Sequence, residues 1–306
     1  MNRVFALTCG GAVGCWLTLF LPRQPPVDPR FPPELTQFAP HGGIRFAGAG
    51  GDAWDRQIRE RGFILKEGPA YHLWYTGYRQ NTDEHHLGYA TSPDGLTWMR
   101  HPANPIHAVN WVEDVMVVKH QGTYHMVAEG RDDVAHLLTS TDRVRWREHG
   151  PLDIRYTTGR PLTKGPYGTP TLWREGDVWY LFYERNDEAV WLATSRDLKR
   201  WTNVRDSPVL TKGPAAYDRY GLAVNQIIRY RGRYYAYYHG TAYADWREWT
   251  TNVAVSTDLI HWTKWSGNPV VGPDHSSGIL VHDGQRYRLY VMHPAVRVFL
   301  PRSAGS

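Results

Sequence analysis

Five glycines that recur every 52 to 56 residues constrain the fold of this 306-residue chain more than any other feature. Each stands between a short apolar run and a run rich in tyrosine and tryptophan; they are Gly68, Gly122, Gly176, Gly232 and Gly284. Glycine adopts the backbone angles of tight turns, and β-branched and aromatic residues suit half-buried strands. Each glycine therefore predicts the turn of a β-hairpin. A fixed period of this length indicates one supersecondary unit repeated along the chain.

A second pattern, Ser-x-Asp-x-x-x-Trp, follows each of the first four hairpins and ends at Trp98, Trp146, Trp201 and Trp262. Serine and aspartate side chains hydrogen-bond to turn amides, and the tryptophan then packs back onto the sheet. Four copies at equivalent positions favour packing between repeats over sugar stacking. The chain is 13% aromatic, and the two patterns account for most of that content.

Each unit is thus two consecutive hairpins, and no long amphipathic helical stretch interrupts the series. Radial packing around an axis protects the edges of such units. The sequence predicts an all-β chain that folds as a five-bladed β-propeller of four-stranded antiparallel blades. The fifth unit lacks the second pattern, so we expect residues 296–300 and 44–47 to close the ring together.

Residues 1–22 are typical of a signal peptide or membrane anchor, because an uncharged apolar stretch from residue 4 to 21 follows Arg3. Both cysteines, Cys9 and Cys15, lie in this stretch, so the exported part would contain none. Residues 22–40 hold seven of the 21 prolines, which predicts an extended linker over residues 23–40. The folded domain would be residues 41–306, exported to the periplasm, the extracellular space or a membrane-anchored position.

The 35 basic and 30 acidic residues give a net charge of +5, and no basic run occurs anywhere. A scattered excess of this size favours solubility and argues against a nucleic-acid-binding face. We expect a monomer without a nucleic-acid partner, which contacts a membrane only through its N-terminal segment.

In a propeller the first strand of each blade lines the axis, and the second strand returns to the same face. Side chains at the starts of first strands and at the ends of second strands therefore converge on one funnel. The starts fall at Glu60, Asp114, Thr169, Asn225 and Ser276 or Ser277, and the second strands end at Gly77, Glu129, Glu184, His239 and His293. Acids concentrate in blades 1 to 3, where Asp55 and Glu113 lie nearby. Crowded carboxyl groups shift each other's pKa values apart, as an acid–base pair requires.

At these residues the chain resembles the clan of five-bladed propeller glycoside hydrolases that contains families 43 and 32. The resemblance covers residue 41 to the C-terminus, and its carriers are the runs 71–75, 87–98, 113–118 and 179–183. It implies an aspartate before blade 1 as base or nucleophile. It also implies an aspartate at blade 2 that tunes pKa values or stabilises the transition state, and a glutamate before blade 3 as proton donor.

The blade-2 aspartate matches Asp114, although Val115 replaces the usual proline. The blade-1 position falls on Glu60, with Asp55 as the competing candidate. Gly168 stands where the blade-3 glutamate is expected, so the proton donor would be Glu184 or Glu129. These carboxyl groups would flank an oxocarbenium-like transition state as proton donor and as base or nucleophile.

The neighbours of these acids are the candidates for substrate binding. Arg61, Arg131 and Arg185 would orient the acids, bind sugar hydroxyls or form plain salt bridges, and Trp111 and Tyr167 would form a sugar platform or pack at the rim. Thr169 and Asn225 begin first strands and are further candidates. His239 and His293 would hydrogen-bond to sugar; a structural divalent cation in the axial channel is the alternative. No cofactor or catalytic metal is required.

The predicted function is a glycoside hydrolase that acts on poly- or oligosaccharides of plants or microbes, of the arabinofuranoside, xyloside or fructofuranoside type. One alternative is a glycoside phosphorylase on the same scaffold, which uses a single acid. A sialidase-like enzyme is another, because residues 92–98 resemble an Asp box that is one residue short. The last is a carbohydrate-binding propeller without catalysis, which the absence of the blade-3 glutamate leaves open.

Overall fold

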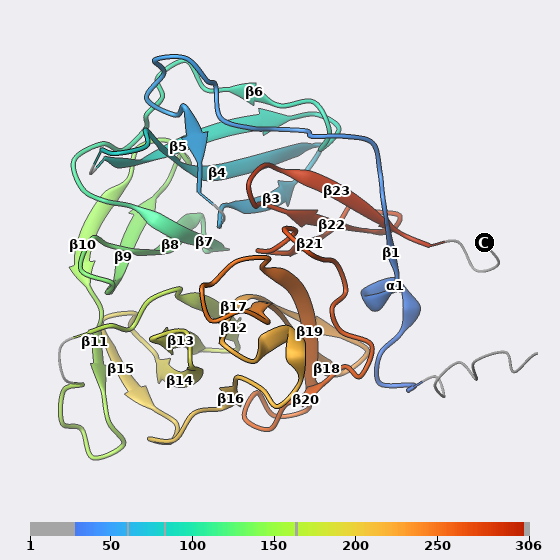
Figure 1. Cartoon of the computed structure of the whole chain (residues 1–306). Coiled ribbons are helices and arrows are strands. Elements are labelled where there is room, and N and C mark those ends of the chain that lie inside the picture. The colour runs from blue at the N-terminus through green and yellow to red at the C-terminus, as the bar shows by residue number, and fades with distance from the viewer. Residues whose placement is uncertain (1–27, 60, 83, 163–164, 303–306) are drawn as a thin grey trace, which may run out of the picture.

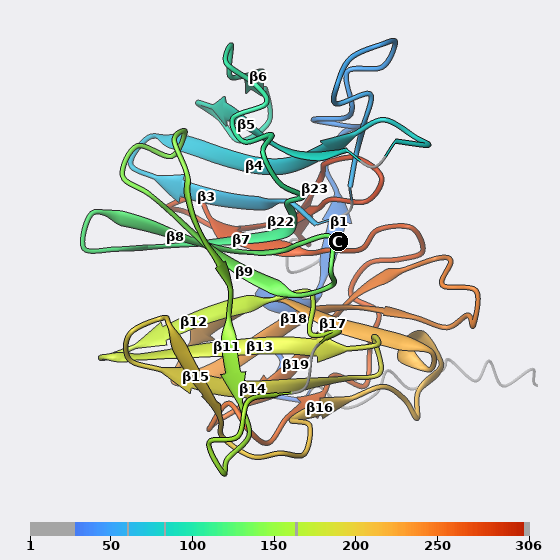
Figure 2. The same cartoon turned by 90° about the vertical axis from the view of Figure 1, so that its left-hand side faces the viewer.

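The computed structural model describes residues 28–59, 61–82, 84–162 and 165–302. Apart from the short helix α1 (Pro33–Thr36) and the 3-10 turn η1 (Ala216–Asp218), its regular elements are strands. They form five separate sheets around a common centre (Figure 1), and their strands pair antiparallel except for β11 (Asp153–Arg155) with β15 (Arg200–Asn203). Figure 2 shows the sheets of blades 1, 2 and 3 one below another.

The strands of blades 1 and 2 follow one another in the sheet in chain order. Blade 1 consists of β3 (Phe63–Glu67), β4 (Ala70–Tyr78), β5 (His85–Ser92) and β6 (Met99–Arg100), with β2 (Gln57–Ile58) added to β4. Blade 2 consists of β7 (Glu113–His120), β8 (Thr123–Glu129), β9 (Ala135–Ser140) and β10 (Arg147–Pro151).

The next two blades repeat this order. Blade 3 consists of β12 (Thr171–Glu175), β13 (Val178–Arg185), β14 (Ala189–Ser195) and β15 (Arg200–Asn203). Two short strands extend it, β11 (Asp153–Arg155) beside β15 and β16 (Leu210–Thr211) beside β14. Blade 4 consists of β17 (Gly221–Tyr230), β18 (Arg233–Thr241), β19 (Thr250–Ser256) and β20 (Thr263–Lys264).

Blade 5 joins the two ends of the described chain. Its strands are β21 (Ile279–His282), β22 (Tyr287–Val291), β23 (Arg297–Pro301) and, from the N-terminal side, β1 (Phe38–Pro40). The first strands contact one another in a closed ring, β3 to β7, β12, β17, β21 and back to β3. The predicted five-bladed propeller is therefore confirmed.

Both repeated patterns have the predicted structural roles. All five turn glycines have positive φ, from 57° to 107°, the region that glycine enters without strain. In each Ser-x-Asp-x-x-x-Trp turn the aspartate accepts backbone N–H groups two and three residues ahead. Trp201 is fully buried, and Trp146 packs edge-on against Trp74 of the neighbouring blade. These aromatic residues stabilise the blades.

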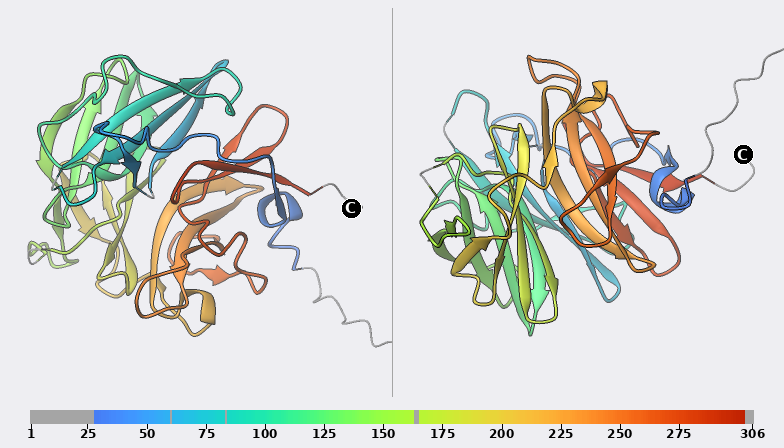
Figure 3. Two further views of the ribbon diagram at one scale, coloured as in Figure 1. Left: turned by 45° about the horizontal axis from the view of Figure 1, so that its top comes forward. Right: turned by 90° about the horizontal axis from the view of Figure 1, so that it is seen from below.

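The ring closes through an earlier segment than the sequence predicts. The expected contact exists, since Phe46 and Val296 form an isolated bridge, but the outer strand of blade 5 is β1. Residues 28–40 are therefore packed against the propeller where a linker was predicted, with Phe31, Leu35 and Phe38 buried. Figure 3 shows α1 close to the C-terminal strand in both views. These three apolar side chains and the open edge of β23 explain the difference.

The predicted signal peptide or anchor and residues 23–27 of the predicted linker lie outside the described residues. Within residues 28–59, 61–82, 84–162 and 165–302, no helix is long and apolar enough to cross a membrane.

Candidate active site

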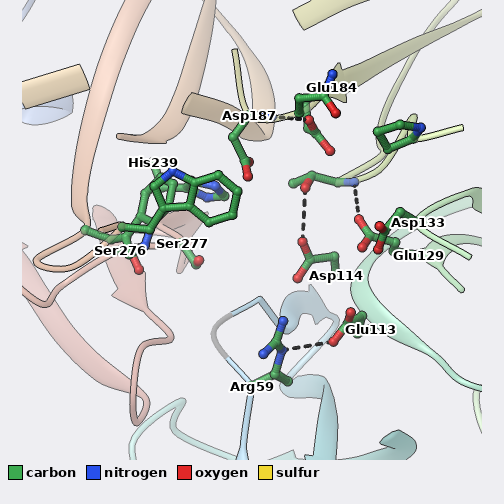
Figure 4. Close-up of a pocket in the computed structure, with 15 residues that line it drawn as sticks. Arg59, Glu113, Asp114, Glu129, Asp133, Glu184, Asp187, His239, Ser276 and Ser277 are labelled. Atoms are coloured by element: carbon green, nitrogen blue, oxygen red, sulfur yellow. Dashed lines mark hydrogen bonds and ion pairs between the residues drawn. The ribbon is translucent and has the colours of Figure 1, made fainter. Parts of the chain in front are cut away.

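A cavity of about 490 Å³ opens where the first strands begin and the second strands end. Its lining includes six carboxylates, which come from blades 2 and 3: Glu113, Asp114, Glu129, Asp133, Glu184 and Asp187. Blades 4 and 5 contribute the opposite wall with His239, Trp246, Trp249, Ser276 and Ser277. Figure 4 shows His239, Ser276 and Ser277 on one side and the labelled carboxylates of blades 2 and 3 on the other. The acids predicted in blades 2 and 3 therefore converge at one place.

Three residues at the starts of first strands have left-handed backbone conformations and line this cavity. Asp114, Thr169 and Ser277 have φ values of 52°, 42° and 58°, which are uncommon for residues other than glycine. A bulge between Glu113 and Met116 interrupts the pairing of β7 with β8 at Asp114. Such bulges redirect a side chain out of its sheet, and strained backbone of this kind concentrates at functional sites.

Thr169 ties the acids of blade 2 to the start of blade 3. Its backbone N–H donates to Oε2 of Glu129 at 2.7 Å, and its hydroxyl donates to Oδ2 of Asp114 at 3.2 Å. Thr169 is itself buried, and both hydrogen bonds are partly shielded from bulk water. One residue thus sets the positions of two predicted catalytic side chains.

Gly168 explains how the site is built without the expected glutamate. A methyl group placed on its Cα would lie 2.1 Å from Oε2 of Glu129 and 2.8 Å from Oε1 of Glu184. Two carboxyl groups from the ends of β8 and β13 therefore occupy the space beside this glycine. The carbonyl of Gly168 also accepts the backbone N–H of Glu184 at 3.1 Å. Any larger residue here would push the two carboxyl groups away.

These two glutamates are the groups most able to hold a proton at neutral pH. Burial, with the charges of Asp114 and Glu113, raises the pKa of Glu129 well above its usual value. Burial and the nearby Asp187 raise the pKa of Glu184 to about 8. Oε2 of Glu184 also accepts the backbone N–H of Asp187 at 2.6 Å. A protonated carboxyl group therefore stands among ionised ones.

Arg61 lies beneath the acids and not in the cavity wall. Its side chain is fully buried, and its Nη2 donates to the carbonyl of Pro170 at 2.7 Å and to Oγ1 of Thr171 at 2.5 Å. Burial lowers the pKa of Arg61 to about 10, opposed by the negative charges of Asp114, Glu129 and Glu184. A group buried this deeply does not touch a sugar, so the predicted direct contact of Arg61 with substrate is wrong.

Asp55 is the second predicted residue that the structure places elsewhere. Its buried carboxylate accepts the hydroxyl of Tyr75 at 2.9 Å and pairs with Nε of Arg100 at 2.8 Å. Gly77 makes this possible, because a Cβ there would lie 2.5 Å from that of Asp55. Asp55 therefore fastens residues before blade 1 to the sheet. Its competitor Glu60 lies outside the described residues, so its role stays a prediction.

Among the predicted binding residues, Thr169 and His239 line the cavity. Asn225 is buried and hydrogen-bonds through Nδ2 to Nδ1 of His239 at 2.9 Å, so it orients that ring. Tyr167 is buried and packs edge-on against Tyr183, with 6.3 Å between ring centroids. Tyr167 is thus core and not a platform.

The remaining predicted binding residues lie outside the axial cavity. The guanidinium of Arg185 sits 5.8 Å from the ring centroid of Trp191. His293 is half-buried and is not part of the cavity lining. Trp111 and Arg131 line a neighbouring cavity.

Sequence reasoning missed two parts of the lining. Asp133 and Asp187 lie in the turns after β8 and β13, four residues beyond Glu129 and three beyond Glu184. Trp246 and Trp249 belong to an eight-residue loop between β18 and β19, which is the equivalent position on blade 4. Trp246 is 52% exposed. Trp249 packs edge-on against His239, with 4.9 Å between the ring centroids. Counting from the turn glycines to the ends of the second strands identified Glu129 and Glu184. The same count, continued for a few more residues, reaches these loops.

The cation considered above stays a prediction. Among the residues that the structure describes, no group of three or more His, Cys, Asp or Glu side chains is arranged to hold a metal ion. That the chemistry needs no cofactor stays a prediction.

Comparison with solved structures identifies the fold, whereas no protein-family model and no curated protein matches the chain. A candidate glycoside hydrolase from Parabacteroides distasonis superimposes with a TM-score of 0.71 at 14% identity, over 89% of this chain and 97% of that one. The chain has the fold of the five-bladed propeller glycosidases.

Two further neighbours extend this likeness to other families. A structure from glycoside hydrolase family 130 matches with a TM-score of 0.68 at 15% identity, over 87% of this chain and 93% of that one. That family is described as mannoside phosphorylases that include hydrolases of β-1,2-mannosidic linkages in Candida mannan. A thermostable family-43 glycoside hydrolase matches with a TM-score of 0.60 at 16% identity, over 83% and 91% of the two chains. At sequence identities this low, the structural similarity establishes the shared fold alone.

Proposed function

We propose that the protein is a glycoside hydrolase whose acid and base act in the axial cavity. One observation carries the proposal: Glu129 and Glu184 converge beside Gly168 with raised pKa values, next to Asp114. Glycoside hydrolysis requires one protonated and one ionised carboxyl group on the two sides of the scissile bond. Environments that separate the pKa values of neighbouring acids assign these two roles.

Glu184 is the proton donor in this proposal. Its pKa of about 8 keeps it protonated at neutral pH, and it lines the cavity directly. It would transfer its proton to the glycosidic oxygen as the bond to the anomeric carbon breaks. Glu129 lies beside the same glycine, and its pKa is raised as well. Asp114, held by the Thr169 hydroxyl, would stabilise the positive charge that develops on the sugar ring.

Two carboxylates compete for the role of base or nucleophile. Asp187 lines the cavity beside Glu184 (Figure 4), and Glu60 is the position that the family resemblance implies. A replacement of each by its amide separates them, because only the loss of the true nucleophile or base removes turnover of activated substrates.

The charge of the cavity favours hydrolysis over phosphorolysis. Its described lining carries six acidic side chains but a single arginine, Arg59, whose Nε pairs with Glu113 at 2.9 Å. Even with Glu129 and Glu184 protonated, four carboxylates remain. A phosphate dianion needs fixed positive charge, and crowded carboxylates repel it. The same repulsion argues against sialic acid and uronic acids as substrates. Neutral furanosides and pyranosides remain, with arabinofuranosides, xylosides, fructofuranosides and, from the family-130 neighbour, β-mannosides as the first candidates.

The decisive experiment is a screen of nitrophenyl furanosides and pyranosides, with the anomer of the first product followed by NMR. Turnover without phosphate supports hydrolysis, and a sugar phosphate that forms only with added phosphate supports the phosphorylase alternative. Binding without any product would indicate a carbohydrate-binding propeller.

Two variants test the assigned residues on the substrate found. Glu184→Gln should reduce kcat by 100-fold or more on natural oligosaccharides and less on nitrophenyl glycosides, whose leaving group needs little protonation. Asp114→Asn should abolish turnover with an unfolding free energy within about 1 kcal/mol of the parent. Glu188→Gln is the matched control, since Glu188 is exposed and pairs with Lys212. Full activity of the Glu184→Gln and Asp114→Asn variants would overturn the site.

A further inference from the structure

A second cavity of about 600 Å³ lies between blades 1 and 2 and contains two residues that the sequence had marked for substrate binding. Trp111 and Arg131 line it, together with residues that begin β5, precede β7 and follow β8. The guanidinium of Arg131 sits 5.3 Å from the ring centroid of Trp111, and the ring of His85 stacks on Trp111 at 3.7 Å. An aromatic group and a cation are thus held together at this surface.

The second cavity shares a wall with the axial cavity. The loop after β8 alternates between them: Glu129 and Asp133 line the axial cavity, whereas Gly130, Arg131 and Asp132 line the second. The two cavities also meet where Nε2 of His85 approaches Oε2 of Glu113 at 3.8 Å. A molecule bound at Glu129 would therefore extend over one short loop to reach Arg131.

The polar groups of the second cavity are already fixed by one another. Glu148 accepts from Nδ1 of His136 at 3.1 Å and from the amide of Asn110, and Nε2 of His107 lies 3.6 Å away. His136 also faces Asp132 at 3.4 Å. Rigid donors and acceptors beside an aromatic ring are the usual composition of a site for a small polar ligand.

The charges and donors of this cavity select a neutral polyol. Three carboxylates, Glu84, Asp132 and Glu148, outnumber the single arginine in the lining, which disfavours an anion. A metal ion is disfavoured too, because the described residues include no group of three or more ligands placed to hold one. Sugar hydroxyl groups both donate and accept, so they match this mixture of carboxylates, amide, imidazole and guanidinium.

We infer that this second cavity is an outer carbohydrate subsite, which binds a further sugar unit of an oligosaccharide whose scissile bond lies in the axial cavity. The inference rests on the proposed function for the position of that bond. It makes the enzyme selective for chains over single glycosides. Arg131 is its main hydrogen-bond donor, and Trp111 is its apolar surface.

The test compares substrates of different length on Arg131→Met. The probes are nitrophenyl arabinofuranoside, xyloside and mannoside against arabino-, xylo- and β-1,2-manno-oligosaccharides of two to five units. For the sugar that is turned over, the ratio of oligosaccharide KM to monoglycoside KM should rise 5- to 10-fold. Arg196→Met, in a separate surface cavity of blade 3, is the matched control and should leave that ratio as in the parent.

A binding measurement separates this inference from the proposed function. Calorimetry of the same oligosaccharides on Glu184→Gln, with and without Arg131→Met, should show 5- to 10-fold weaker binding in the double variant. If the double variant binds more weakly but the parent turns over none of the oligosaccharides, the proposed subsite is supported and the proposed hydrolase activity is refuted. Equal effects on short and long substrates, equal affinities, or no oligosaccharide binding would overturn the subsite.

Discussion

Replacement of Arg61 tests whether its buried positive charge lowers the pKa values of the acids in the axial cavity. The guanidinium is fully buried, hydrogen-bonds to the start of β12, and interacts electrostatically with Asp114, Glu129 and Glu184. Arg61→Met removes the positive charge and keeps most of the side-chain length. Arg61→Lys keeps the charge but loses the planar fork of donors.

The size of the effect follows from the hydrogen bonds that link Arg61 to the acids. Arg61 donates to the carbonyl of Pro170, and the N–H of the adjacent Thr169 donates to Glu129, each at 2.7 Å. Two hydrogen bonds and one residue of backbone separate the charges by roughly 8 Å. At an effective dielectric constant of about 20 they interact by about 2 kcal/mol, or about 1.5 pKa units. Without this cation the carboxylates are harder to ionise, so their pKa values rise.

The assay is the pH dependence of kcat/KM for the glycoside that the screen identifies. Both limbs of the bell should move to higher pH by roughly 1.5 units in Arg61→Met, and Arg61→Lys should restore most of the parent profile. Carbon-13 NMR of labelled glutamate carboxyl groups gives the same pKa values without any substrate. Unmoved limbs, a shift to lower pH, or identical profiles for the two variants would refute the electrostatic role.

Three more changes probe separate parts of the molecule. Burial raises the pKa of Glu184 from 4.5 to about 8, so its stabilising contribution is complete below pH 4.5 and is lost as the pH rises through 8. The unfolding free energy of Glu184→Gln should therefore exceed that of the parent at pH 9, by on the order of 5 kcal/mol, but not at pH 4. Gly168→Ala places a methyl group 2.1 Å from Glu129, and the displaced acids should reduce kcat about 100-fold while circular dichroism stays that of the parent. Asp55→Ala removes a buried carboxylate that accepts the hydroxyl of Tyr75 and pairs with the exposed Arg100. It should lower the unfolding free energy in urea by about 2 kcal/mol, with kcat/KM at 20 °C unchanged; a large loss of activity would return Asp55 to the list of catalytic candidates.

The blades were predictable because their signals are local. A turn glycine, an aromatic strand and an aspartate that caps a turn each act within a dozen residues, and five copies make the period visible. The outer strand of blade 5 was not predictable in this way. β1 lies more than 250 residues from its partner β23, and its prolines suggested a linker, although the apolar residues Phe31, Leu35 and Phe38 mark a packed segment.

Strand register identified which acids face the axis, but not how they are paired. Glu129 and Glu184 were found by counting to the ends of second strands, and the structure brings both to Gly168. Asp55 was misassigned because proximity in sequence to blade 1 says nothing about Tyr75 and Arg100, which bind its carboxylate. The sequence left three roles open for Arg61, and it could not decide among them because the hydrogen-bond partners of Arg61 lie more than 100 residues away.

Gly168 changes what the absence of a glutamate before blade 3 means. A missing acid would ordinarily point to lost catalysis, yet the glycine leaves a space that the carboxyl groups of Glu129 and Glu184 fill from the neighbouring second strands. A donor delivered from there is more deeply buried than one on a loop, and burial is the first cause of the raised pKa of both residues. The glycine and the two glutamates therefore act as one unit, because a side chain at position 168 would displace the very groups that replace it.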